Sequence, residues 1–234
     1  MGRMSEATRG ETENLNVVRV NVMGSPNIGV FAKATESYAL FPQGIPQRKL
    51  DRFSSILKVK VLSFDIAQSK LIGVLMAANS KGIIVPHYTT EEEIKFLREN
   101  LKVEVERLKS KYTSVGNLIL VNDKGAIVSS LLGKGGLRLV QNVLDVEAVT
   151  GSIGGLPLPG SMATATNRGA LLHPNVSDEE LSLVADVLGV RVGVGTVNGG
   201  VSYVASGILG NTRGILVGSL TTGPELLTIS SIFG

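Results

Sequence analysis

Few residues in this sequence are of types that could do covalent or metal chemistry. Its 234 residues contain no cysteine, which excludes thiol nucleophiles, thiolate metal ligands and disulfides. The two histidines, His87 and His173, each lie next to a proline, and no His-Glu-x-x-His pattern or paired cluster accompanies either. We therefore interpret both as structural or surface residues, and we predict no catalytic residue, no metal and no cofactor.

Two glycine-rich stretches invite the interpretation of a phosphate-binding loop. Residues 133–136 and 151–155 each contain three glycines. Neither stretch matches the P-loop or the dinucleotide-binding fingerprint. We interpret both as ordinary loops.

The composition excludes further classes of protein. Hydrophobic residues make up 43% of the chain, yet no apolar run approaches the roughly 18 residues that a membrane span needs, so this content must form a core. The net charge of +3 is too small to indicate nucleic-acid binding by itself, and six Phe, four Tyr and no Trp offer few stacking platforms for bases. Residues 1–14 are polar and patternless, and we expect a disordered tail there.

The dominant pattern is a repeat of about 44 residues, which is typical of repeat architectures. Three segments of the type Asn-x-Lys/Arg-Gly and a shorter one, Asn167-Arg168-Gly169, begin at asparagines separated by 43, 45 and 44 residues, and a fainter copy begins at Thr35. The asparagines are Asn79, Asn122, Asn167 and Asn211. The tetrad predicts a hairpin turn in which glycine accepts positive φ. Tyr38 occupies the glycine position of the first copy, so we expect a different turn there.

Each copy predicts a β-β-β-α unit. A Val-x-Val strand comes first, and a continuous apolar run follows that we interpret as a buried strand opening on a small residue. The small residues are Gly29, Gly73, Gly116, Ser161 and Ala205. After the hairpin comes an amphipathic helix, as at Leu50, Phe53, Ile56 and Leu57. Capping-box spacing marks three helix starts, with Thr90 and Glu93, Ser177 and Glu180, and Thr222 and Glu225.

The phase of the repeat predicts a single α/β domain over residues 15–234. Its units are expected at about 15–57, 58–101, 102–144, 145–188 and 189–232. The last unit ends in apolar residues that need a neighbour, and the strand around Val17 to Val22 is the candidate. These end residues are Leu226, Leu227, Ile229, Ile232 and Phe233. We therefore predict a closed ring of five units with pseudo-fivefold symmetry, helices outside and a central channel.

Several motifs, in order and at matched spacing, resemble the archaeal translation initiation factor 6 family from Val17 to Phe233. The motifs are Val115-Gly116-Asn117, Asn122-Asp123-Lys124-Gly125, Asn167-Arg168-Gly169-Ala170-Leu171-Leu172-His173-Pro174, Gly195-Thr196-Val197-Asn198 and Thr221-Thr222-Gly223-Pro224-Glu225-Leu226. The resemblance implies a monomeric, cytoplasmic, pentein-type ring that binds the large (50S) ribosomal subunit. There it would contact a ribosomal protein near the sarcin-ricin loop and adjacent rRNA, prevent association with the small (30S) subunit by steric hindrance, and take part in large-subunit maturation. Leu220 departs from the family, many of whose members have an acidic residue there.

Binding residues are expected in the connectors between the first two strands of each unit, because loops on a rigid scaffold carry function. By pseudosymmetry these connectors should emerge on one face, and they include Ser69 with Lys70 and the segments 107–113, 150–160 and 195–202. The resemblance places Asn117 and Arg107 on the ribosome-binding face, with Thr196 and Asn198 in a motif nearby. The candidate ribosome-binding residues are Ser69, Lys70, Arg107, Thr113, Asn117, Thr196 and Asn198.

Each candidate also has a purely structural interpretation. Asn117 would bond the backbone at the start of a strand, Arg107 would be a solvated charge, and Thr196 and Asn198 would serve turn chemistry. Two other functions stay open as well. Other pentein folds are enzymes with a cysteine nucleophile, which this chain lacks, so an enzyme here would need carboxylates from several units to meet in the channel. A structural ring scaffold would instead self-associate without ribosomes.

Overall fold

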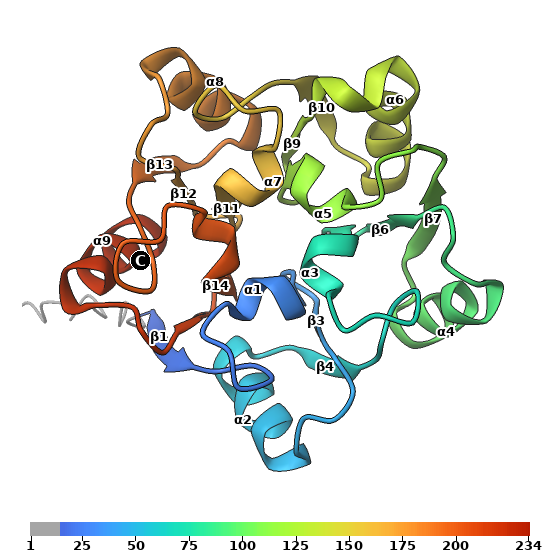
Figure 1. Ribbon diagram of the computed structural model, residues 1–234, viewed down its shortest axis with the longest axis horizontal. Coiled ribbons are helices and arrows are strands. Elements are labelled where there is room, and N and C mark those ends of the chain that lie inside the picture. Colours follow the sequence, from blue (N-terminus) through green and yellow to red (C-terminus); the bar gives the residue numbers. More distant parts are fainter. Residues whose placement is uncertain (1–14) are drawn as a thin grey trace, which may run out of the picture.

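Five small sheets and five long helices surround a central axis, as the five copies of the repeat predict (Figure 1). The structure is a computed structural model that describes residues 15–234. The expected disordered tail over residues 1–14 lies outside the described residues. None of the helices in the described part is long and apolar enough to cross a membrane.

Every sheet has three strands, with the third strand of a unit in the middle. The first strands are β1 (Asn16–Val20), β4 (Lys60–Ser63), β7 (Glu104–Leu108), β10 (Glu147–Thr150) and β13 (Arg191–Val194). The second strands are β2 (Lys33–Ala34), β5 (Ala77–Ala78), β8 (Ile119–Val121), β11 (Ala163–Ala165) and β14 (Ile208–Asn211). The third strands are β3 (Tyr38–Phe41), β6 (Gly82–Pro86), β9 (Gly125–Val128), β12 (Gly169–Leu172) and β15 (Gly214–Gly218).

Each sheet joins two consecutive units. A third strand pairs antiparallel with the second strand of its own unit and parallel with the first strand of the next, as β3 does with β2 and β4. At the end of the chain, β15 pairs in parallel with β1, with Val17 opposite Ile215. The predicted closure of the ring is thus made by one strand of the first unit completing the last sheet.

The long helices cover the outer side of the ring (Figure 1). They are α2 (Gln47–Leu57), α4 (Glu91–Leu101), α6 (Gly133–Leu144), which follows the 3-10 helix η1 (Ser130–Leu132), α8 (Asp178–Leu188) and α9 (Gly223–Phe233). The amphipathic pattern is confirmed in α2, where Leu50, Phe53, Ile56 and Leu57 are buried. The three predicted capping boxes begin α4, α8 and α9.

The end of the chain packs largely as expected. Ile229, Ile232 and Phe233 of α9 are buried in one cluster with Leu15 and Val17 beside them. The exception is Leu227, whose side chain is 75% exposed on the outer side of α9. Leu227 was wrongly predicted to need a neighbour, because its position in the helix turns it away from the sheet.

The small residue predicted to open a buried strand instead lies in a one-turn helix, so that prediction was wrong. The one-turn helices are α1 (Ile28–Phe31), α3 (Ile72–Leu75), α5 (Val115–Leu118), α7 (Pro159–Met162) and the 3-10 helix η2 (Val204–Ser206). They pack against one another around the axis. A Cβ on Gly73 would lie 1.8 Å from the carbonyl oxygen of Gly29, and one on Gly116 would lie 2.0 Å from that of Gly73. Glycine is needed here because neighbouring backbones touch.

The fourth copy of the turn begins one residue earlier than the sequence pattern placed it. Thr166, not Asn167, accepts hydrogen bonds from the backbone N–H groups of Arg168 and Gly169 through its side-chain oxygen. Asn122 does the same for Lys124 and Gly125. The corresponding small residue is therefore Gly160, whose Cβ would lie 2.0 Å from the Gly116 carbonyl oxygen, and not Ser161.

Four of the five turns end in a glycine, and that glycine is required for a different reason from the one predicted. Gly82, Gly125, Gly169 and Gly214 do not have positive φ. A Cβ on Gly82 would instead lie 2.0 Å from the carbonyl oxygen of Val143 in α6. The first turn, expected to differ, has the same hydrogen bonds from Ser37 and Tyr38 to the Thr35 hydroxyl. In the other four turns, the glycine allows a helix of the next unit to pack closely against the turn.

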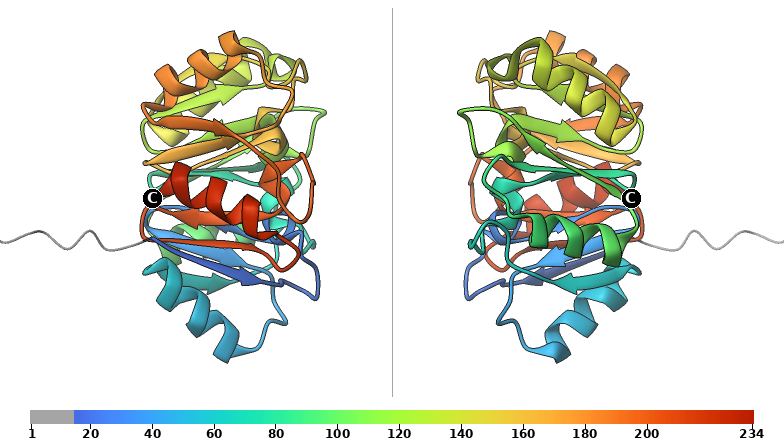
Figure 2. Two further views of the ribbon diagram at one scale, coloured as in Figure 1. Left: turned by 90° about the vertical axis from the view of Figure 1, so that its left-hand side faces the viewer. Right: turned by 90° about the vertical axis from the view of Figure 1, so that its right-hand side faces the viewer.

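The strand directions give the ring two different ends. Because first and third strands are parallel and second strands antiparallel, the first-to-second connectors and the third-strand-to-helix connectors meet at one end, which we call the loop face. It comprises residues 21–27, 42–46, 64–71, 87–90, 109–114, 129–132, 151–158, 173–177, 195–203 and 219–222. The hairpin turns and the C-terminus lie at the opposite end, the turn face (Figure 2).

Candidate functional site

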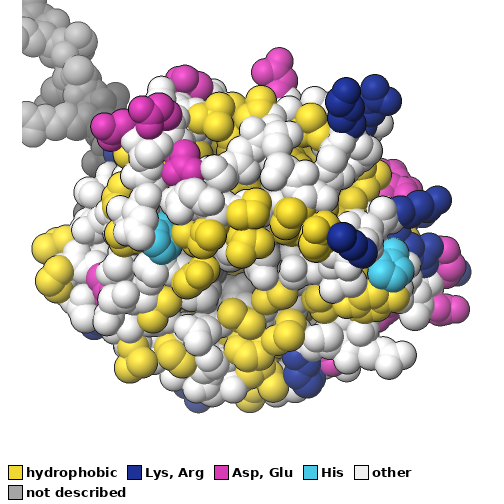
Figure 3. Space-filling view, turned by 45° about the horizontal axis from the view of Figure 1, so that its top comes forward, with side chains coloured by type: hydrophobic (Ala, Val, Ile, Leu, Met, Phe, Trp, Pro, Cys, Tyr) yellow, Lys and Arg dark blue, Asp and Glu magenta, His cyan; other side chains and the backbone are white. Residues whose placement is uncertain are grey.

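Exposed apolar side chains concentrate on the loop face. Of the eleven large hydrophobic residues that are exposed in the described part of the chain, eight lie in loop-face connectors. They are Met23, Leu71, Tyr88, Leu131, Leu156, Val201, Tyr203 and Leu220. The tilted view in Figure 3 shows hydrophobic side chains in a band across the molecule. Exposed apolar side chains that gather on one face are typical of an interaction surface, whereas single scattered ones are normal on any protein surface.

The Lys and Arg residues of the loop face are confined to two of its described connectors. Within the described loop-face connectors, the Lys and Arg residues are Lys70, Lys109 and Lys111, and the one carboxylate is Asp65. Asp65 is paired with Lys70 at 3.2 Å. Lys109 and Lys111 are exposed in the connector 109–114. The loop face therefore combines a broad apolar part with a smaller cationic part.

Five of the seven predicted binding residues lie in loop-face connectors as expected, namely Ser69, Lys70, Thr113, Thr196 and Asn198. Ser69 closes a tight turn by a backbone bridge with Ile66, and Thr113 lies in the connector before α5. The Lys70 ammonium donates to the Gln43 carbonyl oxygen at 2.8 Å as well as to Asp65. Lys70 therefore also ties two neighbouring connectors together.

Arg107 belongs to strand β7 and not to a connector. Its Nε donates to the carbonyl oxygen of Thr89 at 2.7 Å, and its guanidinium pairs with Glu91 at 2.6 Å. Both partners lie at the start of α4. The structure thus replaces the interpretation of a freely solvated charge with an ion pair that fixes the start of this helix.

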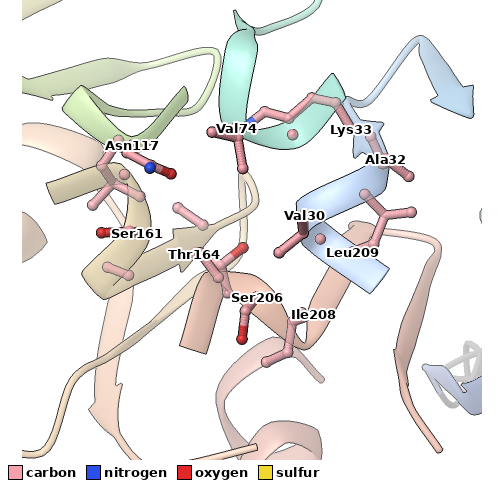
Figure 4. A pocket seen from close by; sticks show the side chains of 18 of the residues that line it. Val30, Ala32, Lys33, Val74, Asn117, Ser161, Thr164, Ser206, Ile208 and Leu209 are labelled. Atoms are coloured by element: carbon pink, nitrogen blue, oxygen red, sulfur yellow. The ribbon is translucent and has the colours of Figure 1, made fainter. Parts of the chain in front are cut away.

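Asn117 lies in the one-turn helix α5 and lines the central cavity, with its side chain directed into the space (Figure 4). The alternative of an asparagine bonding the backbone at a strand start does not apply, because the residue is helical. Helix α5, which contains Asn117, and the connector 109–114 before it lie across the ring axis from residues 195–203 (Figure 1). The predicted residues therefore form two separate groups, and Asn117, which belongs to α5, does not lie in a loop-face connector.

Thr196 and Asn198 form the second group, and both make contacts inside the molecule. The Thr196 hydroxyl donates to Glu225 at 2.7 Å. Asn198 is buried, has a φ of 51°, and donates from its side chain to the carbonyl oxygen of Pro26 at 3.0 Å. Asn198 therefore joins the last unit's connector to that of the first unit, which fits the interpretation of turn chemistry.

Sequence reasoning missed that the capping-box glutamates also hold the loop-face connectors. Glu225 accepts hydrogen bonds from the backbone N–H groups of Gly199 and Gly200 at 3.0 and 2.9 Å, in addition to Thr222. Glu180 does the same for Gly154 and Gly155. The available signal was a pair of glycines about 25 residues before Glu180 and before Glu225.

These contacts set the ionisation of Glu225. Burial alone would raise the pKa of its carboxyl group, but hydrogen bonds from Thr222, Thr196, Gly200 and Gly199 outweigh that effect and lower the pKa to about 2. The carboxylate is charged throughout the physiological range. It serves as a fixed anchor for the connector 195–203.

The central cavity has a volume of about 200 Å³ and is lined mainly by the one-turn helices and the second strands (Figure 4). Its described lining residues include no Asp, Glu or His, and Lys33 is the one charged side chain. An enzyme of the kind considered above would need carboxylates from several units to meet there. The lining does not provide that arrangement.

Two carboxylates do approach the axis at the turn face, where both are engaged in bonds between units. Asp123 accepts from the Ser80 hydroxyl at 2.9 Å and from the Asn167 side chain at 2.8 Å. Glu36 accepts from the Thr212 hydroxyl at 2.6 Å and from the Asn167 backbone N–H at 3.3 Å. These carboxylates link the turns of different units, which accounts for them without catalysis.

The histidines also have structural surroundings. His173 is buried, its Nδ1 accepts from the Asn175 backbone N–H at 3.0 Å, and its ring meets Tyr203 edge-on. His87 meets the Tyr88 ring in the same manner. The described residues contain no group of three or more His, Cys, Asp and Glu side chains that could hold a metal ion.

Comparison with known proteins gives a consistent result over almost the whole chain. Residues 17–232 match the model of the eIF-6 family. A protein named translation initiation factor 6 from Pyrococcus horikoshii is 40% identical over 225 residues, covering 94% of this chain and 99% of that protein. Its namesake from Methanococcus vannielii is 42% identical over 219 residues, covering 91% and 96%. A third, from Staphylothermus marinus, is 37% identical over 218 residues, covering 92% and 96%.

Proposed function

This chain belongs to the eIF-6 family, and from that premise we propose that it is a translation initiation factor that binds the large (50S) ribosomal subunit through its loop face. The observation that carries the proposal is the concentration of exposed apolar side chains on that face. Specific protein interfaces need a buried core of apolar and aromatic residues. Met23, Leu156 and Tyr203 supply such residues from three different units.

The two parts of the loop face suit the two kinds of surface on a ribosomal subunit. The apolar part fits a ribosomal protein, since its desolvation favours binding without a charge partner. The cationic part, Lys109 and Lys111, fits phosphate groups of adjacent rRNA, where each neutralised phosphate releases a counterion. A partner near the sarcin-ricin loop, as the family resemblance implies, would offer both.

The proposed mechanism is steric and needs no chemistry. A rigid ring on the subunit-joining side of the large subunit would occupy space that the small (30S) subunit needs. The bonds between units favour such rigidity, because they hold connectors to their neighbours or to a helix, as Asn198 is held to Pro26. In this proposal the factor acts as a cytoplasmic monomer and also accompanies large-subunit maturation.

A subunit-joining experiment tests the proposal. Purified large and small subunits are mixed with and without the protein, and joined ribosomes are quantified on sucrose gradients. The proposal predicts fewer joined ribosomes in proportion to the protein bound to large subunits. Unchanged joining with large subunits saturated by the protein would refute the steric mechanism. An assembly of the protein with itself at the same concentrations would favour the scaffold hypothesis.

A further inference from the structure

Lys33 breaks the fivefold repeat inside the central cavity. It is the first residue of β2 and lies two residues before Thr35, which begins the first hairpin turn. The residues at the same position in the other units are uncharged: Ala77, Leu120, Thr164 and Leu209. Packing of the second strand at this position therefore does not need a lysine.

The Lys33 ammonium has no counter-charge within residues 15–234. No hydrogen bond or ion pair of a described residue reaches it, and the side chain is half-buried. Removal from water lowers its pKa to about 8. A partly desolvated cation without a partner is unfavourable, so a neutral residue would give a more stable ring. The position of the charge is best explained by an anionic group that enters the cavity.

The remaining lining suits such a group. Asn117 and Thr164 project into the same space from α5 and β11, and no hydrogen bond within the described residues uses their side chains (Figure 4). Both can donate hydrogen bonds to an oxygen atom. Two further hydroxyls of the lining are already used, since Ser161 donates to Leu158 and Ser206 donates to Tyr203. No described lining residue is a carboxylate, and the nearby Glu36 and Asp123 at the turn face are engaged in hydrogen bonds between units.

We propose that the central cavity binds a small molecule through an oxyanion, a phosphate or a carboxylate, with Lys33 as counter-charge and Asn117 and Thr164 as hydrogen-bond donors. The cavity volume of about 200 Å³ is below the roughly 300–1,000 Å³ of pockets for drug-sized ligands, which limits the ligand to a few non-hydrogen atoms beyond the oxyanion. This site is separate from ribosome binding. Either proposal can fail without the other, because the ligand is tested on the free protein.

The test measures the thermal stability of the full-length protein at pH 7 in phosphate, in acetate and in chloride at the same ionic strength. Binding to the folded state alone raises Tm, by about 3 °C at ten times Kd for a chain of this size. We expect phosphate, acetate or both to raise Tm above the chloride value, and the more effective ion identifies the group. Equal Tm values in all three salts would overturn the proposal, because the cavity would then hold only water.

Two variants locate the effect. Lys33→Leu introduces the residue that Leu120 and Leu209 already provide at equivalent positions, so we expect it to fold and to lose the anion-dependent shift. Thr164→Val should reduce the shift and gives a second test within the cavity. Lys109→Leu, which removes an exposed lysine from the loop face, should keep the full shift. A Lys33→Leu variant with the full shift would show that the anion binds elsewhere.

Discussion

Asn122 donates from its side-chain nitrogen to the carbonyl oxygen of Thr166 at 3.1 Å, which joins the hairpin turns of two neighbouring units. The same nitrogen donates to the Leu188 carbonyl oxygen at the end of α8. Asn79 and Asn211 make the equivalent pairs of bonds. The recurring asparagine thus shapes its own turn with its oxygen and holds the next unit with its nitrogen.

In the first unit, a different residue makes the bond to the next unit. Thr35 has no amide to donate, and the Tyr38 hydroxyl bonds the Asn79 carbonyl oxygen at 2.8 Å instead. That carbonyl is the acceptor that an asparagine at position 35 would use. Tyr38 therefore stands at the position that is glycine in the other turns because its hydroxyl makes the bond to the next unit that Thr35 cannot make.

Removing the asparagine nitrogen should destabilise the ring. Asn122→Thr keeps an oxygen to shape the turn, as Thr35 and Thr166 do, but leaves two buried carbonyl groups without a donor. We expect a loss of about 2–3 kcal/mol in the free energy of unfolding, measured by urea denaturation. The reverse change, Thr166→Asn, adds a donor where the chain lacks one and should stabilise by about 1 kcal/mol. Equal stability of Asn122→Thr and the unmodified protein would contradict this role.

Glu225 should contribute a stability that depends on pH. Its pKa falls from an ordinary 4.5 to about 2 in the folded protein, so the contribution is fully present above about pH 4.5 and is lost as the pH falls toward 2. The shift corresponds to a few kcal/mol at most. Glu225→Gln should therefore be less stable at pH 7, and the gap to the unmodified protein should close between pH 4.5 and 2 in thermal unfolding. A gap that stays constant over this range would argue against the carboxylate as the anchor.

Lys33 should contribute a destabilisation that depends on pH. Its pKa is lowered from 10.5 to about 8 by desolvation, so the unfolded chain binds the proton more tightly than the folded one. In chloride buffers, Lys33→Leu should exceed the unmodified protein in stability below pH 8, by up to about 3 kcal/mol. That advantage should shrink as the pH rises from 8 to 10.5. A stability difference independent of pH would mean that the ammonium is well solvated.

The sequence alone predicted the ring because two periodic signals, the turn tetrads and the Val-x-Val strands, agree at about 44 residues. It placed the long helices well, since apolar spacing and capping boxes are local properties. It erred where the cause is non-local: glycines such as Gly73 and Gly82 were attributed to strands or turns, although they are required by a neighbouring unit's backbone. The phase error at Asn167 arose because Thr166 can shape the turn without resembling asparagine in sequence.

For the candidate binding residues too, the sequence predicted their positions but not their non-local contacts. Ser69, Lys70 and Thr113 were placed on the loop face by topology, which strand order determines. The internal partners of Arg107 and Asn198 were not predictable, because they lie in other elements of the fold. The apolar part of the face was missed altogether, since exposed residues such as Met23 and Tyr203 cannot be told from core residues before the fold is known.

Phosphate contacts by the cationic part of the loop face should appear as a salt effect. Lys109→Glu should weaken binding to large subunits and make it less sensitive to salt, since each lost phosphate contact reduces the slope of log K against log salt by roughly 0.7–0.9. Lys95→Glu is the matched control, because Lys95 is exposed on the outer helix α4. Binding is measured by sedimentation at two or more salt concentrations. Identical slopes for both variants would remove Lys109 from the interface.

Co-sedimentation with purified large ribosomal subunits at low salt tests the central claim most directly. The unmodified protein is compared with Tyr203→Asp, which places a charge in the apolar part of the loop face, and with Leu227→Asp, which makes the same kind of change on the outer side of α9. We predict that the unmodified protein and Leu227→Asp sediment with the subunit, whereas Tyr203→Asp binds at least about tenfold more weakly. Failure of the unmodified protein to sediment with large subunits, or equal binding of all three, would contradict the account.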